Sequence, residues 1–561
     1  MATRKEATGL PRPQFHPQPL VWALAALCGS APLAQAFDFD TGNPDLRTRW
    51  DNTVKYSSAW RTRSQSGQLT EGSSALNVDD GDRNFDKGLI SSRLDLLSEF
   101  DISYKDFGAR LSGAAWYDDV YNQKNDNDSP ATVNSYSVKY DHFTDDTRKL
   151  HGRQGELLDA FVYGKGELGD VPVSGRIGQY AMQWGESLFY GANGIAGGMA
   201  PIDVVKAVSV PNTQFKELIR PVKQLSGQLQ LTPDVSVGAY YQLEWEANRL
   251  PGAGSYFSSF DAIGDGSERL FIGSPLFPGA QPLAFYHGQD KDAKDTGQGG
   301  LQVKWRTEDY DFGLYAIRFH DKSPQLVTTS DFAHLNALTG YAGEYSWVYP
   351  QGITALGASF STTVESFNIA GELSTRWDQP LASTNQRTLV AGEGLSNDAD
   401  DAVYATGRTL HANLSWLATL SPNVFARETS FLGEFAWNRT LSVTHNPSAV
   451  DPNADRDAWS FRTVYEPMYR QAFSGMDISV PLGLSFTHGA SEALGTAFGS
   501  NRGGDMNIGV KGNYLNTWNL GLTYTHYYGP ASTFLDASNN YSFEQSLKDR
   551  DFVAFSVSRT F

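Results

Sequence analysis

Few residues in this sequence have the types and spacing that enzyme chemistry requires. The stretch FTHGAS places Ser485, His488 and Ser491 close together in the chain. Ser485 and His488 are three residues apart, so on a strand their side chains would point to opposite faces. No Asp or Asn that could orient the histidine is evident, and no Gly-x-Ser-x-Gly turn holds the serine. We therefore expect no serine hydrolase, and we predict that the protein is not an enzyme.

Two other polar groups could bind protons or ions. His287 lies with Asp290 and Asp292 in a polar loop, where exposure to solvent is the simpler interpretation. The acidic runs at 79–82 and 125–128 resemble fragments of calcium loops, but they lack the spaced ligands and distal Glu of a complete one. We interpret them as solvated external loops, with weak divalent-cation binding that bridges lipopolysaccharide as the alternative. No metal site and no cofactor are expected.

The composition restricts the class of protein. The formal net charge of −18 argues against a nucleic-acid partner. A mean hydropathy of −0.39 is too low for a helical membrane protein, but it is compatible with a barrel, in which only alternate residues face lipid. Outside the N-terminus, no apolar run reaches the roughly 20 residues that a transmembrane helix needs.

The first 36 residues have the features of a secretory signal peptide. A basic start is followed by the apolar run LVWALAAL at 20–27, and AQA at 34–36 fits a cleavage site. The exported protein is then predicted to comprise residues 37–561 as a single domain. Cys28 is the only cysteine and lies in the removed segment, so no thiolate would remain for a disulfide or a zinc site.

The C-terminal stretch 551–561 alternates strictly in character. Val553, Phe555 and Val557 share one face and the chain ends on Phe561, while the other face is small or polar. This pattern is typical of the closing strand of a bacterial outer-membrane barrel, and Phe561 is predicted to act in barrel assembly. The alternative is an ordinary last strand of a soluble sandwich. Arg559 is the one residue that departs from the apolar face.

The same alternation recurs along the chain. Short turns alternate with long polar loops between the strands. Trp and Tyr gather near strand ends, as in membrane-interface girdles. We predict an all-β protein, a large antiparallel transmembrane β-barrel of about 16–18 strands. The expected strands are 48–61, 89–105, 109–118, 156–167, 171–184, 223–232, 235–247, 298–307, 310–320, 352–361, 365–377, 407–420, 430–440, 458–466, 475–489, 506–513, 516–528 and 551–561.

One segment, residues 184–222, breaks the strand pattern. It is rich in Gly, and Pro201 and Pro211 interrupt any ladder. Short helices are expected near 201–206 and 211–219. The segment either folds inward as a plug or constriction, or lies over the mouth as an external loop. Its candidate functional residues are Trp184, Glu186, Asp203, Glu217 and Arg220.

Charges inside a narrow lumen must be paired. We expect Arg220 to pair with Glu186 or Asp203. Further charges are predicted on the inner faces of strands, where they would line a conduction path or stiffen a closed barrel; these are Arg93, Asp95, Glu99, Glu244 and Glu246.

The irregular segment also carries a family resemblance. The motifs GRIGQ (175–179), QWGES (183–187), PID (201–203), ELIRPV (217–222) and RLP (249–251) resemble the signature of the domain-of-unknown-function 1302 family. The resemblance implies an outer-membrane protein of Gram-negative bacteria. It also implies a lipoprotein-like partner and an efflux-type inner-membrane transporter, and hence movement of hydrophobic molecules or lipids. No catalytic residues come with the family.

Three functions are compatible with these features. The first is passage or handover of a lipophilic compound or lipid at the outer membrane; the alternatives are a hydrophilic, solute-selective porin and a structural or adhesion barrel. A lumen lined by balanced charges would favour the porin, an apolar pocket the lipid carrier, and a solidly packed lumen the structural barrel. The expected partners include outer-membrane lipids, lipopolysaccharide and the barrel-assembly machinery.

Overall fold

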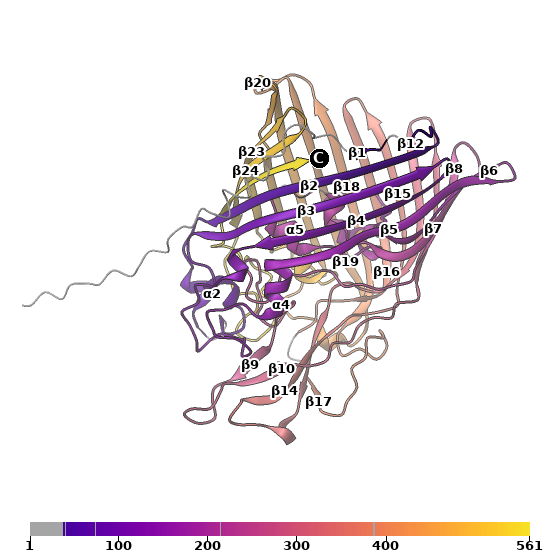
Figure 1. The fold of residues 1–561 in the computed structure, drawn as a ribbon. Helices are drawn as coiled ribbons and strands as arrows, with labels where there is room; N and C mark the ends of the chain where they lie inside the picture. The colour runs from indigo at the N-terminus through magenta and orange to yellow at the C-terminus, as the bar shows by residue number, and fades with distance from the viewer. Residues whose placement is uncertain (1–36, 40, 73–74, 212, 214, 385–387) are drawn as a thin grey trace, which may run out of the picture.

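The protein is a closed antiparallel β-barrel of 18 strands (Figure 1). The computed structural model describes residues 37–39, 41–72, 75–211, 213, 215–384 and 388–561, so the signal peptide predicted at 1–36 lies outside the described residues. Two short strands, β21 and β22, both pair with β20 and β23 and count as one strand, interrupted at Val480–Pro481. The break falls at Pro481 because proline has no N–H to donate to a ladder. The barrel strands are β2 (Leu46–Arg61), β3 (Leu89–Tyr104), β4 (Phe107–Asp118), β5 (Arg153–Leu168), β6 (Val171–Tyr180), β7 (Val222–Gln230), β8 (Val235–Gln242), β11 (Gln298–Arg306), β12 (Tyr310–Phe319), β15 (Ile353–Val364), β16 (Phe367–Pro380), β18 (Thr406–Leu420), β19 (Glu428–His445), β20 (Asp457–Phe473), β21 (Met476–Ser479), β22 (Leu482–His488), β23 (Gly504–Tyr514), β24 (Trp518–Tyr528) and β25 (Phe552–Thr560), with β1 (Phe37–Asp38) beside β2.

The strand β25 closes the barrel. It pairs with β24 on one side and with β2 on the other, where Thr53 lies opposite Thr560. Beyond the strand, the backbone of Phe561 exchanges hydrogen bonds of 2.8 and 3.1 Å with Asn52. The predicted closing strand is therefore confirmed. The role of Phe561 in assembly stays a prediction.

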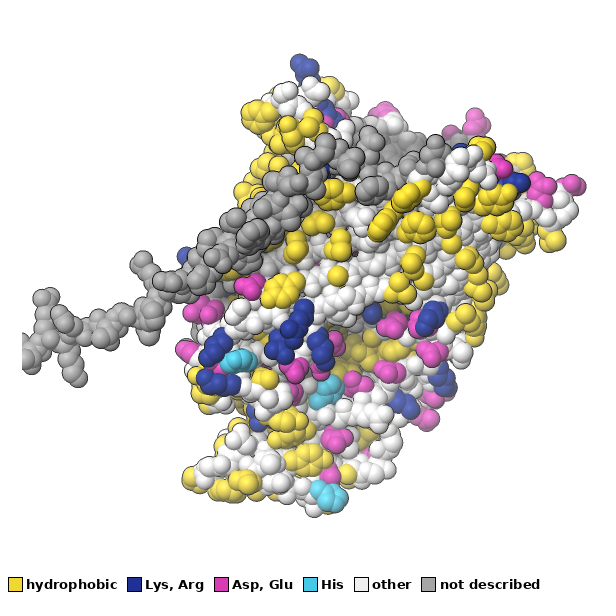
Figure 2. Space-filling view, in the orientation of Figure 1, with side chains coloured by type: hydrophobic (Ala, Val, Ile, Leu, Met, Phe, Trp, Pro, Cys, Tyr) yellow, Lys and Arg dark blue, Asp and Glu magenta, His cyan; other side chains and the backbone are white. Residues whose placement is uncertain are grey.

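Strand alternation separates an apolar outer face from a polar inner one. Large aliphatic side chains of the strands, such as Leu301, Leu356 and Leu522, are about half exposed on the outside. Hydrophobic side chains spread over the strand region in Figure 2. The residues between them, such as Gln302 and Glu372, are buried and point inward. This pattern lets the outer face meet lipid while the inner face makes polar contacts.

The two ends of the barrel differ in the length of their connections. Eight turns of two to seven residues lie at one end, at the top of Figure 1, and nine connections of 11 to 55 residues lie at the other. Two of the turns use non-glycine residues with positive φ, Lys105 at 51° and Glu365 at 54°. We call the second end the loop end. The long connections are 62–88, 119–152, 181–221, 243–297, 320–352, 381–405, 446–456, 489–503 and 529–551.

The described residues contain no helix long and apolar enough to cross a membrane.

A second sheet of five strands stands in the long connections and was not predicted. Its order is β17-β13-β14-β10-β9, and it lies below the barrel in Figure 1. Tyr345 and Trp347 pack in its core with Phe285 and with Val78 of another loop. The strands are β9 (Arg269–Gly273), β10 (Leu283–His287), β13 (Gln325–Ser330), β14 (Tyr341–Val348) and β17 (Thr388–Val390).

The acidic run at 79–82 is buried rather than solvated, so its interpretation as an exposed loop was wrong. Asp79 and Asp82 have no exposed surface, and residues 80–83 form the short helix α3 (Asp80–Arg83). Arg61 on β2 makes an ion pair of 2.6 Å with Asp82 and one of 3.4 Å with Asp549. The long connections therefore fold into the loop end as a packed layer.

Candidate lumen constriction

The connection between β6 and β7 folds into the barrel. Trp184 packs against the inner wall, with its ring 4.9 Å from that of Tyr240 on β8 and 6.3 Å from that of Tyr315 on β12. Met199, from the same connection, is fully buried in this cluster together with Ile353 of β15. The predicted inward-folded segment is thus present, and we refer to residues 184–221 as the inward segment.

A buried carboxylate on β19 holds the first part of the inward segment. Glu434 accepts hydrogen bonds from the backbone N–H groups of Leu188 (3.0 Å), Phe189 and Tyr190 (2.9 Å). The Oγ of Ser187 donates to it as well, at 2.9 Å. An irregular segment has no ladder partner for these N–H groups, so one side chain supplies the acceptor for all three.

A second carboxylate, Glu372 on β16, binds the backbone of the inward segment on either side of these residues. It accepts from the backbone N–H groups of Glu186, at 2.8 Å, and of Ile195. A Cβ at Gly185 would lie 2.2 Å from Glu372, and Gly185 has a φ of +97°. Gly194 makes a similar approach, at 2.7 Å. These glycines are needed because the backbone passes directly over the carboxylate.

Asn193 is the polar centre of this contact. Its Oδ1 accepts from Asn438, at 3.1 Å, and lies 3.0 Å from Nδ1 of His411; its Nδ2 donates to Asn413, at 2.9 Å. Arg376 adds two bonds of 2.8 Å to backbone carbonyls of the segment. The first half of the inward segment is therefore fixed to the wall by polar side chains of β16, β18 and β19.

The second half of the inward segment is held by an ion cluster. Asp203 caps the helix α5 (Val204–Ser209) by accepting from the N–H of Lys206, at 2.8 Å. Its other oxygen pairs with Arg249 at 2.7 Å, and Arg249 also binds Glu156 on β5. Lys206 reaches the same Glu156 at 3.1 Å. We call Glu156, Asp203, Lys206 and Arg249 the lumen cluster; its two cations lie 5.3 and 5.6 Å from the ring of Trp116.

The lumen cluster is balanced and nearly closed to solvent. Its four side chains are at most 14% exposed, with two positive and two negative charges. Although burial lowers the pKa of Arg249, the hydrogen bonds that Arg249 donates to Glu156 and the charge of Asp203 raise it by more, so Arg249 stays charged.

Arg220 does not pair as predicted. Asp203 binds Arg249 and Lys206, while Arg220 lies 3.4 Å from Glu246 and donates to the carbonyl of Ala247 at 2.7 Å. The prediction was wrong because the partner of Asp203, Arg249, comes from another connection, 243–297. The backbone N–H of Arg249 donates to the carbonyl of Ile202, and this hydrogen bond places Arg249 beside Asp203.

The other predicted residues of the inward segment play smaller parts. Glu186 uses its backbone N–H, as described, and its carboxyl group is half-buried. Glu217 lies in the helix α6 (Phe215–Leu218) and interacts electrostatically with Lys55 of β2. The structure therefore brings Trp184 and Asp203 into well-packed sites and leaves Glu217 and Arg220 at the edge.

Some of the charges predicted on the inner faces of strands are paired there, and others do not lie on a strand. Arg93 pairs with Asp95 at 2.7 Å, and Arg110 pairs with Glu99, with Asp101 at 2.9 Å and with Asp159 at 3.2 Å, all on β3 to β5. Glu244 and Glu246 were wrongly placed on an inner strand face, because β8 ends at Gln242.

Sequence reasoning missed the residues that anchor the segment. Glu156, Glu372, Glu434 and Arg249 lie far from it in the chain. Glu372 and Glu434 could have been noticed in the sequence, since each is a lone carboxylate among small or polar inner-face residues. That pattern does not show which segment the carboxylate binds.

A cavity of about 570 Å³ lies in the lumen toward the turn end. Thr213 of the inward segment borders it, opposite wall residues of β2, β21, β23 and β24. Its charged lining residues are Lys55, Arg470, Asp477 and Lys511. Arg470 pairs with Asp477 and Glu428, and Lys511 lies 3.4 Å from Glu466. The arrangement can hold water and polar solutes between the segment and the turns.

Comparison with known proteins decides the family. A family model described as "Protein of unknown function (DUF1302)" matches residues 18–561. The chain belongs to the DUF1302 family. No curated protein matches the chain in sequence.

Solved structures resemble this DUF1302 protein only at a distance. Acinetobacter baumannii OccAB2 and OccAB3 are each 10% identical, with TM-scores of 0.42 and 0.43; 92% of this chain is covered, and 98% and 99% of theirs. Pseudomonas aeruginosa OpdK with vanillate is 11% identical with a TM-score of 0.38, covering 92% and 98%. Scores at this level support no argument about what the DUF1302 protein does.

The residues first considered for chemistry are separated in this DUF1302 structure. Ser485 faces the lumen and donates to Asp505 at 2.6 Å, whereas the ring of His488 lies 5.6 Å from that of Trp459 on the opposite face. His287 was wrongly placed in a polar loop: it is the last residue of β10 in the five-stranded sheet and is half-buried, with Nε2 3.0 Å from Asp290. That the protein is not an enzyme stays a prediction.

Proposed function

We propose that the protein is a selective porin of the outer membrane, which passes small hydrophilic solutes through a lumen narrowed by the inward segment. The observation that carries the proposal is the character of the inner wall. It presents paired charges on β3 and β4 and a carboxylate and an amide on β18 and β19, and the segment that crosses it is held by polar contacts. A lumen of balanced charge favours polar solutes because a polar solute exchanges its water for such groups at little cost.

The lipophilic cargo predicted first has weaker support. The apolar hollow formed by Leu46, Ile102, Phe107, Val162 and Ile177 is on the outer face of β2 to β6, where the surrounding lipid would fill it. The lumen cavity instead has 11 polar or charged residues among its 15 lining residues. We therefore favour the porin over lipid handover. A lipoprotein-like partner and an inner-membrane transporter remain part of the proposal only as carriers that would receive the solute.

Single-channel conductance in planar bilayers tests the proposal. The wild-type protein should give small, discrete ion-conducting steps. A Glu372→Gln and Glu434→Gln double variant removes the charges that hold the inward segment and should raise the step size and its noise. The reason is that five backbone N–H groups lose their charged acceptors.

The matched control is Glu466→Gln. Glu466 is also an inward-facing wall carboxylate, but its polar partners among the described residues are Lys511 and Ser479 near the turns, and none belongs to the inward segment. It should alter ion selectivity without raising the step size. A wild type and double variant that both fail to conduct would contradict the porin and favour the structural barrel. Lipid retained stoichiometrically by a non-conducting protein would favour lipid handover.

A further inference from the structure

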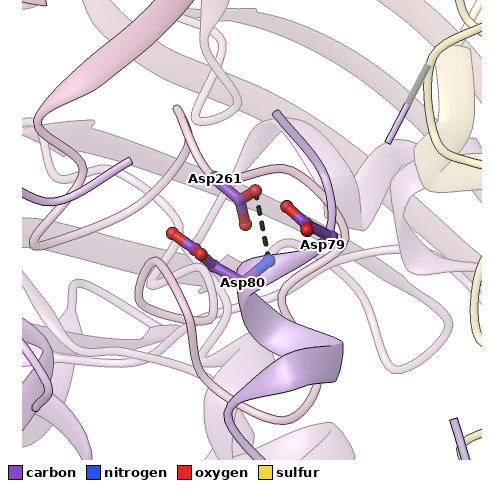
Figure 3. Close-up of side chains that lie close together, drawn as sticks. All are labelled: Asp79, Asp80 and Asp261. Atoms are coloured by element: carbon purple, nitrogen blue, oxygen red, sulfur yellow. Dashed lines mark hydrogen bonds between the residues drawn. The ribbon is translucent and has the colours of Figure 1, made fainter. Parts of the chain in front are cut away.

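Three buried carboxylates converge at the loop end, outside the lumen. Asp79 and Asp80 begin α3 in the connection 62–88, and Asp261 comes from the connection 243–297. Each offers an oxygen within 4.8 Å of the other two. Figure 3 shows the three side chains pointing toward one another, with Asp261 accepting a 3.3 Å bond from the backbone N–H of Asp80.

Ion pairs balance only part of their negative charge. The residues are 0, 5 and 1% exposed. Among the described residues, only Asp79 has an ion pair, with Arg83. Asp80 accepts from the N–H of Asn134 at 2.9 Å and weakly from Asn127 at 3.4 Å. Three buried carboxylates with one paired cation leave an excess of negative charge that burial makes costly.

Unpartnered oxygens point to a missing ligand. Asp261 Oδ1 is buried and accepts no hydrogen bond among the described residues, and the same holds for Asn134 Oδ1. The orientation of the Asn134 amide is fixed, because its Nδ2 donates to Asn77 Oδ1 at 2.8 Å and to the carbonyl of Arg269 at 2.9 Å.

The same residues enclose a small space. Asp80, Asp261 and Asn134 together line a cavity of about 20 Å³. Roughly 10–15 Å³ is enough for one water-sized particle. The side chain of Asn134 is almost completely buried and lines this space.

The donor atoms identify the class of ligand. All are oxygens, which suits a hard cation, and no nitrogen or sulfur ligand of the kind that zinc prefers takes part. Ca²⁺ binds oxygens at 2.3–2.6 Å, so two of its ligands can be at most about 5 Å apart, and the oxygens of this cluster lie within that limit. Ligands from three separate loops form an irregular set, which Ca²⁺ accepts and the octahedral Mg²⁺ does not.

We propose that Asp79, Asp80 and Asp261, with the amide oxygen of Asn134, bind one Ca²⁺ that ties together the connections 62–88, 119–152 and 243–297. We call these four residues the loop-end acidic site. From the sequence, residues 79–82 were predicted to be a solvated loop without a metal site, with weak cation binding only as the alternative; the proposed site is instead buried and includes a ligand 181 positions further along.

Electrostatics agrees with a cation there. Burial, and after it the charge of Asp79, raises the pKa of Asp80 to about 8; burial raises the pKa of Asp79 to about 6 although Arg83 opposes the shift. Without a cation the site therefore retains protons near neutral pH, and Ca²⁺ must displace them. The other charged groups that act on it are Arg269, Arg550 and Glu268.

Calcium analysis of the purified full-length protein tests the site. After equilibrium dialysis against Ca²⁺ in detergent, one ion should remain per chain, with a dissociation constant of about 10⁻³ M or tighter, the range of extracellular calcium modules. Asp80→Asn and Asp261→Asn should each weaken binding at least about 100-fold, since changes in the outer shell alone cost 10–100-fold.

Asp128→Asn is the matched control. Asp128 is an acidic residue of the same loop layer with a 90% exposed side chain, so its loss should leave the stoichiometry and affinity unchanged. Equal loss in the control would mean diffuse screening rather than a site, and would overturn the proposal. So would a wild type that retains no Ca²⁺ at millimolar concentration, or one in which Mg²⁺ competes equally.

Thermal unfolding gives a second readout, which starts from the wild type and then compares it with a variant. Chelation should lower the unfolding midpoint of the wild type. In chelator, Asp261→Asn should unfold at or above the wild-type midpoint, because it removes one of three repelling carboxylates; with Ca²⁺ present it should unfold below it. If the same one of the two proteins, wild type or Asp261→Asn, has the higher midpoint both in chelator and in Ca²⁺, the proposal is overturned.

Discussion

The lumen cluster and the loop-end acidic site solve the same electrostatic problem in opposite ways. In the lumen, Arg249 and Lys206 each lie between Glu156 and Asp203 and form ion pairs with both, and the charges cancel. At the loop end, Asp80 and Asp261 have no ion pair among the described residues. Both groups are buried, so burial alone does not distinguish them.

The difference shows what each region requires from outside the chain. A balanced cluster is complete as folded, and its charges serve to hold the inward segment. An unbalanced one depends on solution conditions, since protons or a cation must offset its charge. The comparison predicts that mutation affects the lumen cluster most strongly, whereas pH and metal affect the loop-end acidic site.

The largest effect is expected from Arg249→Ala. It leaves Asp203 and Glu156 with only Lys206, and removing one partner of a buried ion pair typically costs about 3–5 kcal/mol of unfolding free energy. Urea unfolding followed by tryptophan fluorescence measures the loss. Arg439→Ala, which breaks a pair with Asp457 that is about half exposed, is the control and should cost less than about 1 kcal/mol. Equal losses in the two variants would refute the claim that the buried lumen cluster stabilises the fold more than an exposed ion pair does.

A pH series sharpens the other half of the comparison. Because the folded-state pKa of Asp80 is raised from 3.8 to about 8, the folded protein binds more protons than the unfolded chain in this window. In metal-free buffer its stability should therefore fall as pH rises from about 4 to about 8, by about 1.4 kcal/mol for each pKa unit realised. The measurement is the urea midpoint of wild type and Asp80→Asn at each pH.

The comparison with Asp80→Asn separates this effect from other groups that titrate in the same range, such as Asp549 with a pKa of about 6. The slope of the difference should vanish when saturating Ca²⁺ is present. A difference between the two proteins that does not change with pH in chelator would contradict the assignment.

Much of the barrel could be predicted because each strand carries its own signal. The alternation of Val553, Phe555 and Val557 specifies β25 without reference to any partner. The prolines likewise indicated the short helices α5 and α6. Strand ends were predicted less well. Alternation continues to Glu246, yet β8 stops at Gln242, and Trp245 instead packs edge-to-face on Tyr349, with the ring centroids 4.8 Å apart.

The sites could not be predicted because they depend on contacts between distant loops. Asp203 and Arg249 are 46 residues apart, and Asp80 and Asp261 are 181 apart. No local pattern distinguishes Arg249 from Arg220 as the partner of Asp203. The five-stranded sheet was missed for a related reason, since its strands are only three to eight residues long and two of its pairings are parallel.

The smallest effect is expected from Arg220→Ala, at the edge of the lumen cluster. Arg220 is 24% exposed and its partner Glu246 is 42% exposed, at 3.4 Å, so solvent screens the pair. The loss should be at most about 1 kcal/mol, several-fold less than for Arg249→Ala, although both residues are arginines close to Asp203 in the chain or in space. Urea unfolding of the two variants side by side measures the ratio. A loss as large for Arg220 as for Arg249 would mean that the edge carries the inward segment as much as the cluster does, and the boundary drawn around the lumen cluster would then be wrong.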